Sequence, residues 1–141
     1  MKILIINGPN MNMLGIREPE IYGNKTYQDL IDYIDTERGD KNDIYYFQSN
    51  HEGEIIDAIQ QAYYDKIDGI VINPAAYTHY SIAVLDALRS VSVPAVEVHL
   101  SDISARESYR QLSVTKDGCI AQIMGRGVQG YLDASEILEK K

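Results

Sequence analysis

Apolar residues in this chain fall into short continuous runs that alternate with stretches of helical spacing. Five runs predict strands: Lys2–Asn7, Asp43–Gln48, Gly69–Asn73, Pro94–His99 and Gly118–Ile123. Several of them are almost wholly apolar, which is typical of strands covered on both faces. The runs therefore predict a buried, parallel sheet.

Between these runs, apolar residues recur every three or four positions, which predicts helices. The first helix begins at Thr26, with Asp29 as its capping-box partner, and Ser49 and Glu52 form a second predicted capping box. Later helical runs contain Ala83, Ala87 and Leu88, then Tyr131, Ala134 and Leu138, and a shorter helix is expected between Ser104 and Leu112.

Regular alternation of strand and helix predicts an α/β fold with right-handed crossovers. Five strands favour a flavodoxin-like, doubly wound five-stranded parallel sheet with helices on both faces. We expect a single catalytic domain over residues 1–141, with a lid loop at about 8–25. In such folds ligands bind beyond the carboxyl ends of the strands, near the point where the strand order reverses.

The segment from Gly8 to Gly23 is longer than an ordinary strand-to-helix connection, and long connections of this kind are often lids or binding loops. It carries Arg17 five residues before Tyr22. A nearby cation lowers the pKa of an acidic group, so a tyrosine beside an arginine can become a phenolate base. The alternative interpretation is a surface loop with an incidental aromatic residue.

Composition narrows the classes of function. The chain has 141 residues, 45% of them hydrophobic, which suits one globular domain. Its formal net charge of −8 argues against a nucleic-acid partner. No apolar run reaches the ~18 residues of a membrane span, and the first ten residues lack a secretory pattern. The single cysteine, Cys119, fits a reducing cytoplasm and is expected to be an inert buried thiol.

All three histidines lie at or beyond the ends of predicted strands: His51 after the second, His79 after the third and His99 at the end of the fourth. His51 is more simply explained as part of a helix start. Glu97 and His99 stand two positions apart on one strand, so their side chains share a face. A carboxylate beside an imidazole fixes its tautomer and raises its pKa, which makes a general acid.

Four stretches together resemble the type II dehydroquinases, the 3-dehydroquinate dehydratases of the shikimate and quinate pathways: GPNMNMLGIREPEIYG, QSNHEGEIID, INPAAYTHYS and EVHLSDISARESYR. The resemblance covers nearly the whole chain. It implies a flavodoxin-like subunit in a dodecamer built from trimers, with no metal or organic cofactor. It also implies a reversible anti elimination of water from 3-dehydroquinate, which gives 3-dehydroshikimate through an enolate.

The resemblance also assigns catalytic roles. Tyr22 would remove the proton beside the ketone, and Arg17 would keep Tyr22 ionised. His99 would protonate the departing hydroxyl, with Glu97 next to it, and Asn10 would hold a water against the enolate oxygen.

Substrate binding falls to a second group by the same resemblance. The side chains of Asn73, His79 and Arg110 would bind the ring hydroxyls and the carboxylate. The backbone amides of Leu100 and Ser101 would also receive the carboxylate. Asp86 would reach the site of a neighbouring subunit.

The chain departs from the usual family pattern at five positions. The departures are Ala75 for glycine, Leu85 for arginine, Asp102 for asparagine, Ser104 for histidine and Arg126 for leucine. Leu85 puts one interface ion pair in doubt, and Asp102 adds negative charge near the carboxylate site.

Rival functions find less support. A nucleotide- or flavin-binding module needs a glycine-rich turn that leads straight into a helix, whereas Gly8-Pro9-Asn10 leads into a long loop. A phospho-acceptor domain needs an aspartate where this chain has Asn73. Acyl transfer lacks a nucleophile elbow, and a Schiff-base mechanism lacks a lysine at a strand end. The sequence leaves open whether the enzyme serves biosynthesis or quinate breakdown.

Overall fold

The computed structural model describes residues 1–141, apart from the side chain of Tyr22. Its five strands are β1 (Lys2–Asn7), β2 (Asp43–Gln48), β3 (Gly69–Asn73), β4 (Ala95–His99) and β5 (Ala121–Met124). Its α-helices are α1 (Pro19–Tyr22), α2 (Tyr27–Arg38), α3 (Glu52–Tyr64), α4 (Ile82–Ser90) and α5 (Gln129–Glu139). Across the described part of the chain, no helix has the length and apolar character needed to span a bilayer.

Five short 3₁₀ helices occupy connections between the strands and the α-helices. They are η1 (Met11–Met13), η2 (Ala75–His79), η3 (Ile103–Ala105), η4 (Ser108–Arg110) and η5 (Thr115–Gly118). The first four follow the carboxyl ends of β1, β3 and β4, and they supply much of the surface around the candidate site.

The sheet is wholly parallel, with strand order β2-β1-β3-β4-β5. The chain moves outward from β1 to β2 and then returns to the other side of β1 to build β3, β4 and β5. The order therefore reverses between β1 and β3. This is the expected flavodoxin-like, doubly wound arrangement, and it confirms the predicted fold class.

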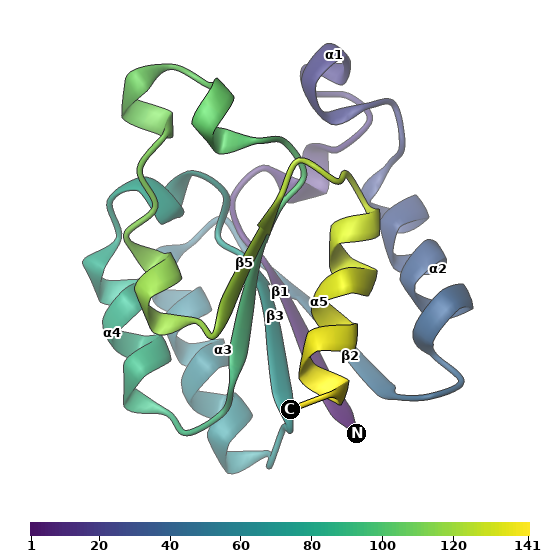
Figure 1. Cartoon of the computed structure of the whole chain (residues 1–141), viewed down its shortest axis with the longest axis vertical. Coiled ribbons are helices and arrows are strands. Elements are labelled where there is room, and N and C mark those ends of the chain that lie inside the picture. The colour runs from purple at the N-terminus through teal and green to yellow at the C-terminus, as the bar shows by residue number, and fades with distance from the viewer.

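Two helical layers cover the sheet. Helices α2 and α5 lie on one face, and α3 and α4 lie on the other (Figure 1). The first layer encloses a core that includes Ile5, Leu30 and Tyr131. The second encloses a core that includes Ile59 and Ile72. Burial on both faces explains why the central strands are almost continuous apolar runs.

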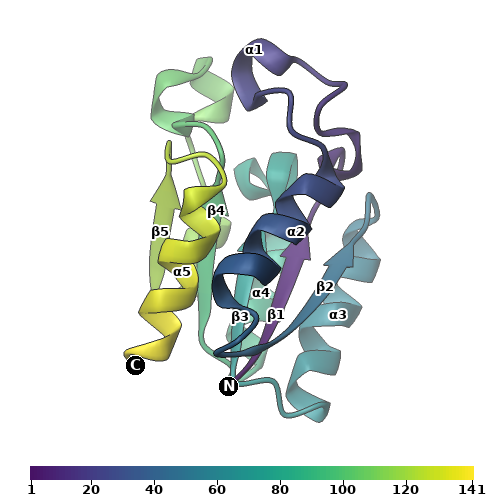
Figure 2. The ribbon, with the colours of Figure 1, turned by 90° about the vertical axis from the view of Figure 1, so that its right-hand side faces the viewer.

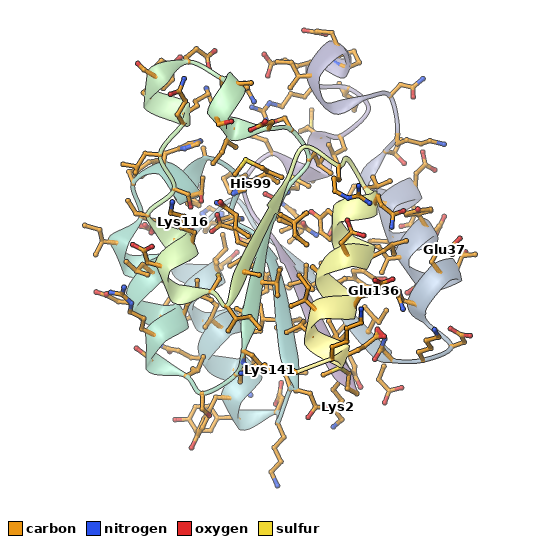
Figure 3. The ribbon with its side chains drawn as sticks, viewed as in Figure 1. Lys2, Glu37, His99, Lys116, Glu136 and Lys141 are labelled. Atoms are coloured by element: carbon orange, nitrogen blue, oxygen red, sulfur yellow. The ribbon has the colours of Figure 1, made fainter. Side chains whose placement is uncertain are left out.

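The two ends of the sheet differ in character. Figure 2 shows α1 and its flanking loops above the carboxyl ends of the strands. His99 lies at this upper end, whereas Lys2 and Lys141 lie at the opposite end (Figure 3). The candidate chemistry is thus separated from both chain termini.

The five strand predictions were confirmed, with changes at three boundaries. The fourth strand begins at Ala95, one residue after Pro94, because proline cannot donate to the ladder. The fifth was predicted as Gly118–Ile123 but runs from Ala121 to Met124, because Gly118 ends the 3₁₀ helix η5. The expected helix between Ser104 and Leu112 is instead the two separate turns η3 and η4.

One predicted capping box was confirmed and one was wrong. Thr26 and Asp29 exchange hydrogen bonds of 3.0 and 3.1 Å at the start of α2. Ser49 does not cap α3, whose N-cap residue is His51 without a side-chain cap bond. The Ser49 hydroxyl instead accepts from the His51 backbone N–H at 2.9 Å and thereby closes the preceding turn.

Candidate active site

A pocket opens at the carboxyl ends of β1, β3 and β4, beside the reversal in strand order. It is lined by Pro9, Asn10, Met11, Leu14, Arg17, Asn73, Ala75, Ala76, His79, His99, Leu100, Ser101, Ile103, Arg106 and Arg110. The predicted residues that it brings together are Asn10, Arg17, Asn73, His79, His99, Leu100, Ser101 and Arg110. These residues come from four separate stretches of the chain, so the fold assembles the site.

The charge of the pocket is opposite to that of the protein. Three arginines and two histidines line it, and none of its described lining residues is a carboxylate. The whole chain has a formal net charge of −8. Local guanidinium groups can bind a carboxylate or another anion although the net charge of the protein is negative. The pocket is therefore suited to an anionic ligand.

His99 is held by a carboxylate behind it. Its Nε2 lies 2.9 Å from Oε2 of Glu97, and both side chains are buried. This contact occupies Nε2, so Nδ1 is the ring nitrogen available to a molecule in the pocket. An imidazole fixed in this way can donate a proton from Nδ1 when it is protonated.

Glu97 remains ionised although it is fully buried. Burial alone would raise its pKa, but hydrogen bonding and charge from His99, with hydrogen bonds from Thr115 and Ser113, outweigh burial and lower the pKa to about 2. A carboxylate in this state accepts a hydrogen bond from the neighbouring imidazole and so holds its ring in place.

A larger hollow lies elsewhere on the surface. It has a volume of about 770 Å³ and lies between β2 and α3, with a rim that includes Glu54, Asp57 and Asp65. Its acidic rim opposes an anion, and no histidine or arginine lines it. The smaller cationic pocket is therefore the better candidate for the chemistry.

Comparisons with known proteins identify the family of the chain. A family profile described as dehydroquinase class II matches residues 1–139. A 3-dehydroquinate dehydratase of Clostridium perfringens is 56% identical over 142 residues, covering 100% of this chain and 99% of that protein. The chain belongs to the type II dehydroquinase family. It is therefore a hydro-lyase.

Solved structures of the family show the same fold. The type II dehydroquinase from Butyrivibrio crossotus matches with a TM-score of 0.96 and 52% identity, over 99% of this chain and 97% of that one. The type II dehydroquinase from Propionibacterium acnes matches with a TM-score of 0.90 and 41% identity, over 98% and 96% of the two chains.

Of the three histidines, two line the dehydroquinase pocket. His79 places Nδ1 2.8 Å from the backbone oxygen of Leu112, which fixes its ring. His51 is exposed at the start of α3 and does not line the pocket, in agreement with a role at the helix start.

The two asparagines are held firmly. Asn10 adopts a left-handed backbone with φ of 68°, and its N–H donates to Oδ1 of Asn50 at 2.9 Å. Asn73 donates from Nδ2 to the hydroxyl of Tyr131 at 3.1 Å and accepts the N–H of Ala75 at 3.1 Å. Neither Asn50 nor Tyr131 was predicted to support the site, because each fits an ordinary turn or helix pattern.

Arg106 is a pocket residue that the sequence analysis missed. Its Nη1 lies 3.4 Å from Oγ of Ser101, and its Nε lies 3.9 Å from Oε2 of Glu107. Arg110 lies 3.1 Å from the same carboxylate oxygen. The four-residue spacing of the two arginines in a segment next to His99 was the available signal.

Three predicted residues do not line the pocket among the described side chains. Glu97 lies behind His99 and contacts it from outside the lining. Asp86 is exposed on α4 and does not line its own chain's pocket. Tyr22 ends α1, but its side chain lies outside the described residues. Arg17 lines the pocket, and its Nη2 lies 3.6 Å from Oε2 of Glu18. The pairing of Arg17 with Tyr22 therefore stays a prediction.

The departures from the family pattern form local contacts. Asp102 accepts hydrogen bonds from the backbone and hydroxyl of Ser104, so these two departures are neighbours. Arg126 pairs with Asp133. Leu85 is buried on α4, where a charged side chain would have to be accommodated differently.

Replacing Ala75 by glycine should raise the free energy of unfolding by about 0.5–1 kcal/mol. Ala75 has φ of 53°, a left-handed conformation that explains the family's usual glycine. Relief of this strain is worth roughly 1–2 kcal/mol, less ~0.4–1 kcal/mol for the greater freedom of the unfolded chain. Urea denaturation measures the change. Ala58→Gly, within α3, is the matched control and should lower stability by about 0.5–1 kcal/mol. If Ala75→Gly lowered stability as Ala58→Gly does, the inferred backbone strain at Ala75 would be contradicted.

Proposed function

We propose that this hydro-lyase catalyses the reversible anti elimination of water from 3-dehydroquinate, giving 3-dehydroshikimate through an enolate. The cationic pocket beside the Glu97–His99 pair is the observation that carries the proposal. It offers a site for the substrate carboxylate and a proton donor for the leaving hydroxyl. The similarity to the 3-dehydroquinate dehydratase of Clostridium perfringens supports the same substrate.

The first step is removal of the proton beside the ketone. We assign it to Tyr22, with Arg17 as the cation that favours the phenolate. Asn10 holds a water against the developing enolate oxygen and so stabilises its charge. The left-handed backbone of Asn10 and its bond to Asn50 support this role, since both fix the start of the lid.

The second step is departure of the hydroxyl. His99 donates a proton from Nδ1 to the hydroxyl, while its Nε2–H stays hydrogen-bonded to the carboxylate of Glu97. As the carbon–oxygen bond breaks, the enolate electrons form the new double bond and the hydroxyl leaves as water with the proton from His99. Both steps depend on proton transfer by side chains and call for no metal or organic cofactor.

Substrate orientation is assigned to the remaining pocket residues. Arg110 and the backbone amides of Leu100 and Ser101 bind the carboxylate, while Asn73 and His79 bind ring hydroxyls. The internal bonds of Asn73 to Tyr131 and Ala75 support this role, because they hold the amide in one orientation before substrate arrives.

The decisive experiment is a direct assay. Purified protein mixed with 3-dehydroquinate should develop the ultraviolet absorbance of a conjugated enone. Activity should reverse when 3-dehydroshikimate is supplied instead. A protein that binds 3-dehydroquinate by calorimetry but gives no absorbance at saturating substrate would contradict the proposed reaction.

We further propose that the enzyme assembles as a dodecamer built from trimers and works in the cytoplasm. Four large side chains around η2, η4 and the start of α4 leave over half of their surface exposed: Tyr80, Ile82, Tyr109 and Leu112. Such a concentration of exposed apolar surface supports an interface. Asp86 lies four residues after Ile82 on α4, so it shares this face and can reach a neighbouring subunit.

Mixing inactive Asp86→Ala and Tyr22→Phe proteins, after dissociation and reassembly, should restore activity at some sites. Those sites would combine Tyr22 from the first protein with Asp86 from the second. Light scattering checks that both variants form the full oligomer, and each variant alone is the control. Mixtures no more active than their separate components would count against a shared site.

A further inference from the structure

The carboxylate of Glu97 is enclosed by donors that the proposed reaction does not use. Its Oε2 lies 2.7 Å from Nε2 of Gln122 and 2.8 Å from Oγ of Ser113. The hydroxyl of Thr115 donates to Oε1, and that of Thr78 lies 3.2 Å from Oε2. These four residues, which we name the carboxylate cage, come from η2, β5, η5 and the segment just before η5.

The protons of the cage suit an ionised carboxylate. The amide nitrogen of Gln122 can only donate, and each hydroxyl has a single proton. When Ser113 and Thr115 give their protons to Glu97, Thr78 gives its own to one of their oxygens, which lie 2.8 and 2.6 Å away. A proton on Glu97 would compete with these donors for the carboxylate oxygens. The cage therefore favours one charge state.

Gln122 is the least expected member of the cage. It stands in β5 directly opposite Glu97 in the parallel ladder, so both side chains project from the same face of the sheet. An aliphatic residue would satisfy the packing of this strand. The short contact with Glu97 gives the amide a specific electrostatic role.

We propose that Gln122, Thr78, Ser113 and Thr115 are positioning residues that keep Glu97 ionised and oriented, and thereby fix His99 with Nδ1 directed to the substrate. This inference rests on the proposed function, in which His99 donates the proton. A carboxylate that lost these donors would take up a proton or turn away from Nε2. The imidazole would then lose the partner that selects its tautomer.

Matched substitutions separate this role from packing. Thr115→Val removes the hydroxyl at nearly constant shape, whereas Thr115→Ser keeps it. Gln122→Met removes the amide donor at similar length. We expect Thr115→Val and Gln122→Met to lower kcat by about 10- to 100-fold, as loss of an outer partner commonly does, with little change in KM. Thr115→Ser should stay close to the parent enzyme. If either variant fails to fold, Ser113→Ala removes a donor with less change in volume.

Nitrogen-15 NMR of the imidazoles tests the same inference without substrate. The chain has only three histidines, so the His99 signals can be assigned with His51→Ala and His79→Ala proteins. The parent should show one neutral tautomer, protonated at Nε2, and Thr115→Val and Gln122→Met should show a mixture. An unchanged tautomer with unchanged kcat would overturn the inference, as would equal loss in Thr115→Ser and Thr115→Val. Failure of the parent to dehydrate 3-dehydroquinate would instead contradict the proposed function, and the NMR result would still stand.

Discussion

Replacing His99 by alanine should reduce turnover by roughly 10²- to 10⁴-fold, because the variant loses the proposed general acid. His99 lies at the end of β4, with Nε2 held by Glu97 and the ring lining the pocket. Loss of this proton slows departure of the hydroxyl more than it weakens binding of the substrate. We therefore expect KM to change little, and steady-state kinetics in both directions measures the split. His99→Gln, which keeps a polar side chain but transfers no proton, should be similarly impaired.

His79→Ala is the matched control for this prediction. His79 lines the same pocket but is fixed by a backbone oxygen instead of a carboxylate. It should chiefly raise KM, because a binding residue stabilises the ground state and the transition state alike. If His79→Ala lost turnover while His99→Ala lost affinity, the two histidines would have to exchange their assigned roles.

Tyr22→Phe should also lower turnover by roughly 10²- to 10⁴-fold, because the ring is kept while the proton acceptor is removed. Isothermal calorimetry should show that 3-dehydroquinate still binds, since the proposed carboxylate site is formed by Arg110, Leu100 and Ser101, which line the pocket. The separation of binding from turnover is the informative result.

Tyr27→Phe gives a matched tyrosine control. Tyr27 accepts a hydrogen bond from Asn7 at 3.3 Å and does not line the pocket, so its loss should leave kcat near the parent value. Near-normal turnover of Tyr22→Phe would mean that another residue removes the proton.

The central fold was predictable because its signals are local and strong. The first three strands were predicted with the bounds that the structure has, since each is a β-rich run that ends at a polar residue. The fifth strand was predicted to begin too early, because Gly118, Cys119 and Ile120 resemble strand residues. They form instead the end of η5 and the connection that follows it. The second capping box failed because the hydroxyl of Ser49 is used by the preceding turn.

Much of the site was also predictable, since parallel strands bring their carboxyl ends to one edge. His79, His99 and Asn73 follow from that rule together with the family resemblance. Gln122 and Tyr131 do not, because each occupies an ordinary strand or helix position and acquires its role only through a distant partner. Contacts of this kind depend on tertiary packing, and no local pattern encodes them.

The single cysteine makes this chain a convenient background for site-specific labelling. Burial, with the charge of Glu97 as a lesser cause, raises the pKa of the Cys119 thiol far above its usual range, and Sγ lies 3.7 Å from the backbone oxygen of Thr115. At neutral pH such a thiol reacts slowly with maleimides, because the thiolate is the nucleophile. A second cysteine placed at an exposed lid position such as Glu20 would then carry nearly all of a fluorescent dye. A movement of the predicted lid would then be detectable by fluorescence without first removing the native thiol.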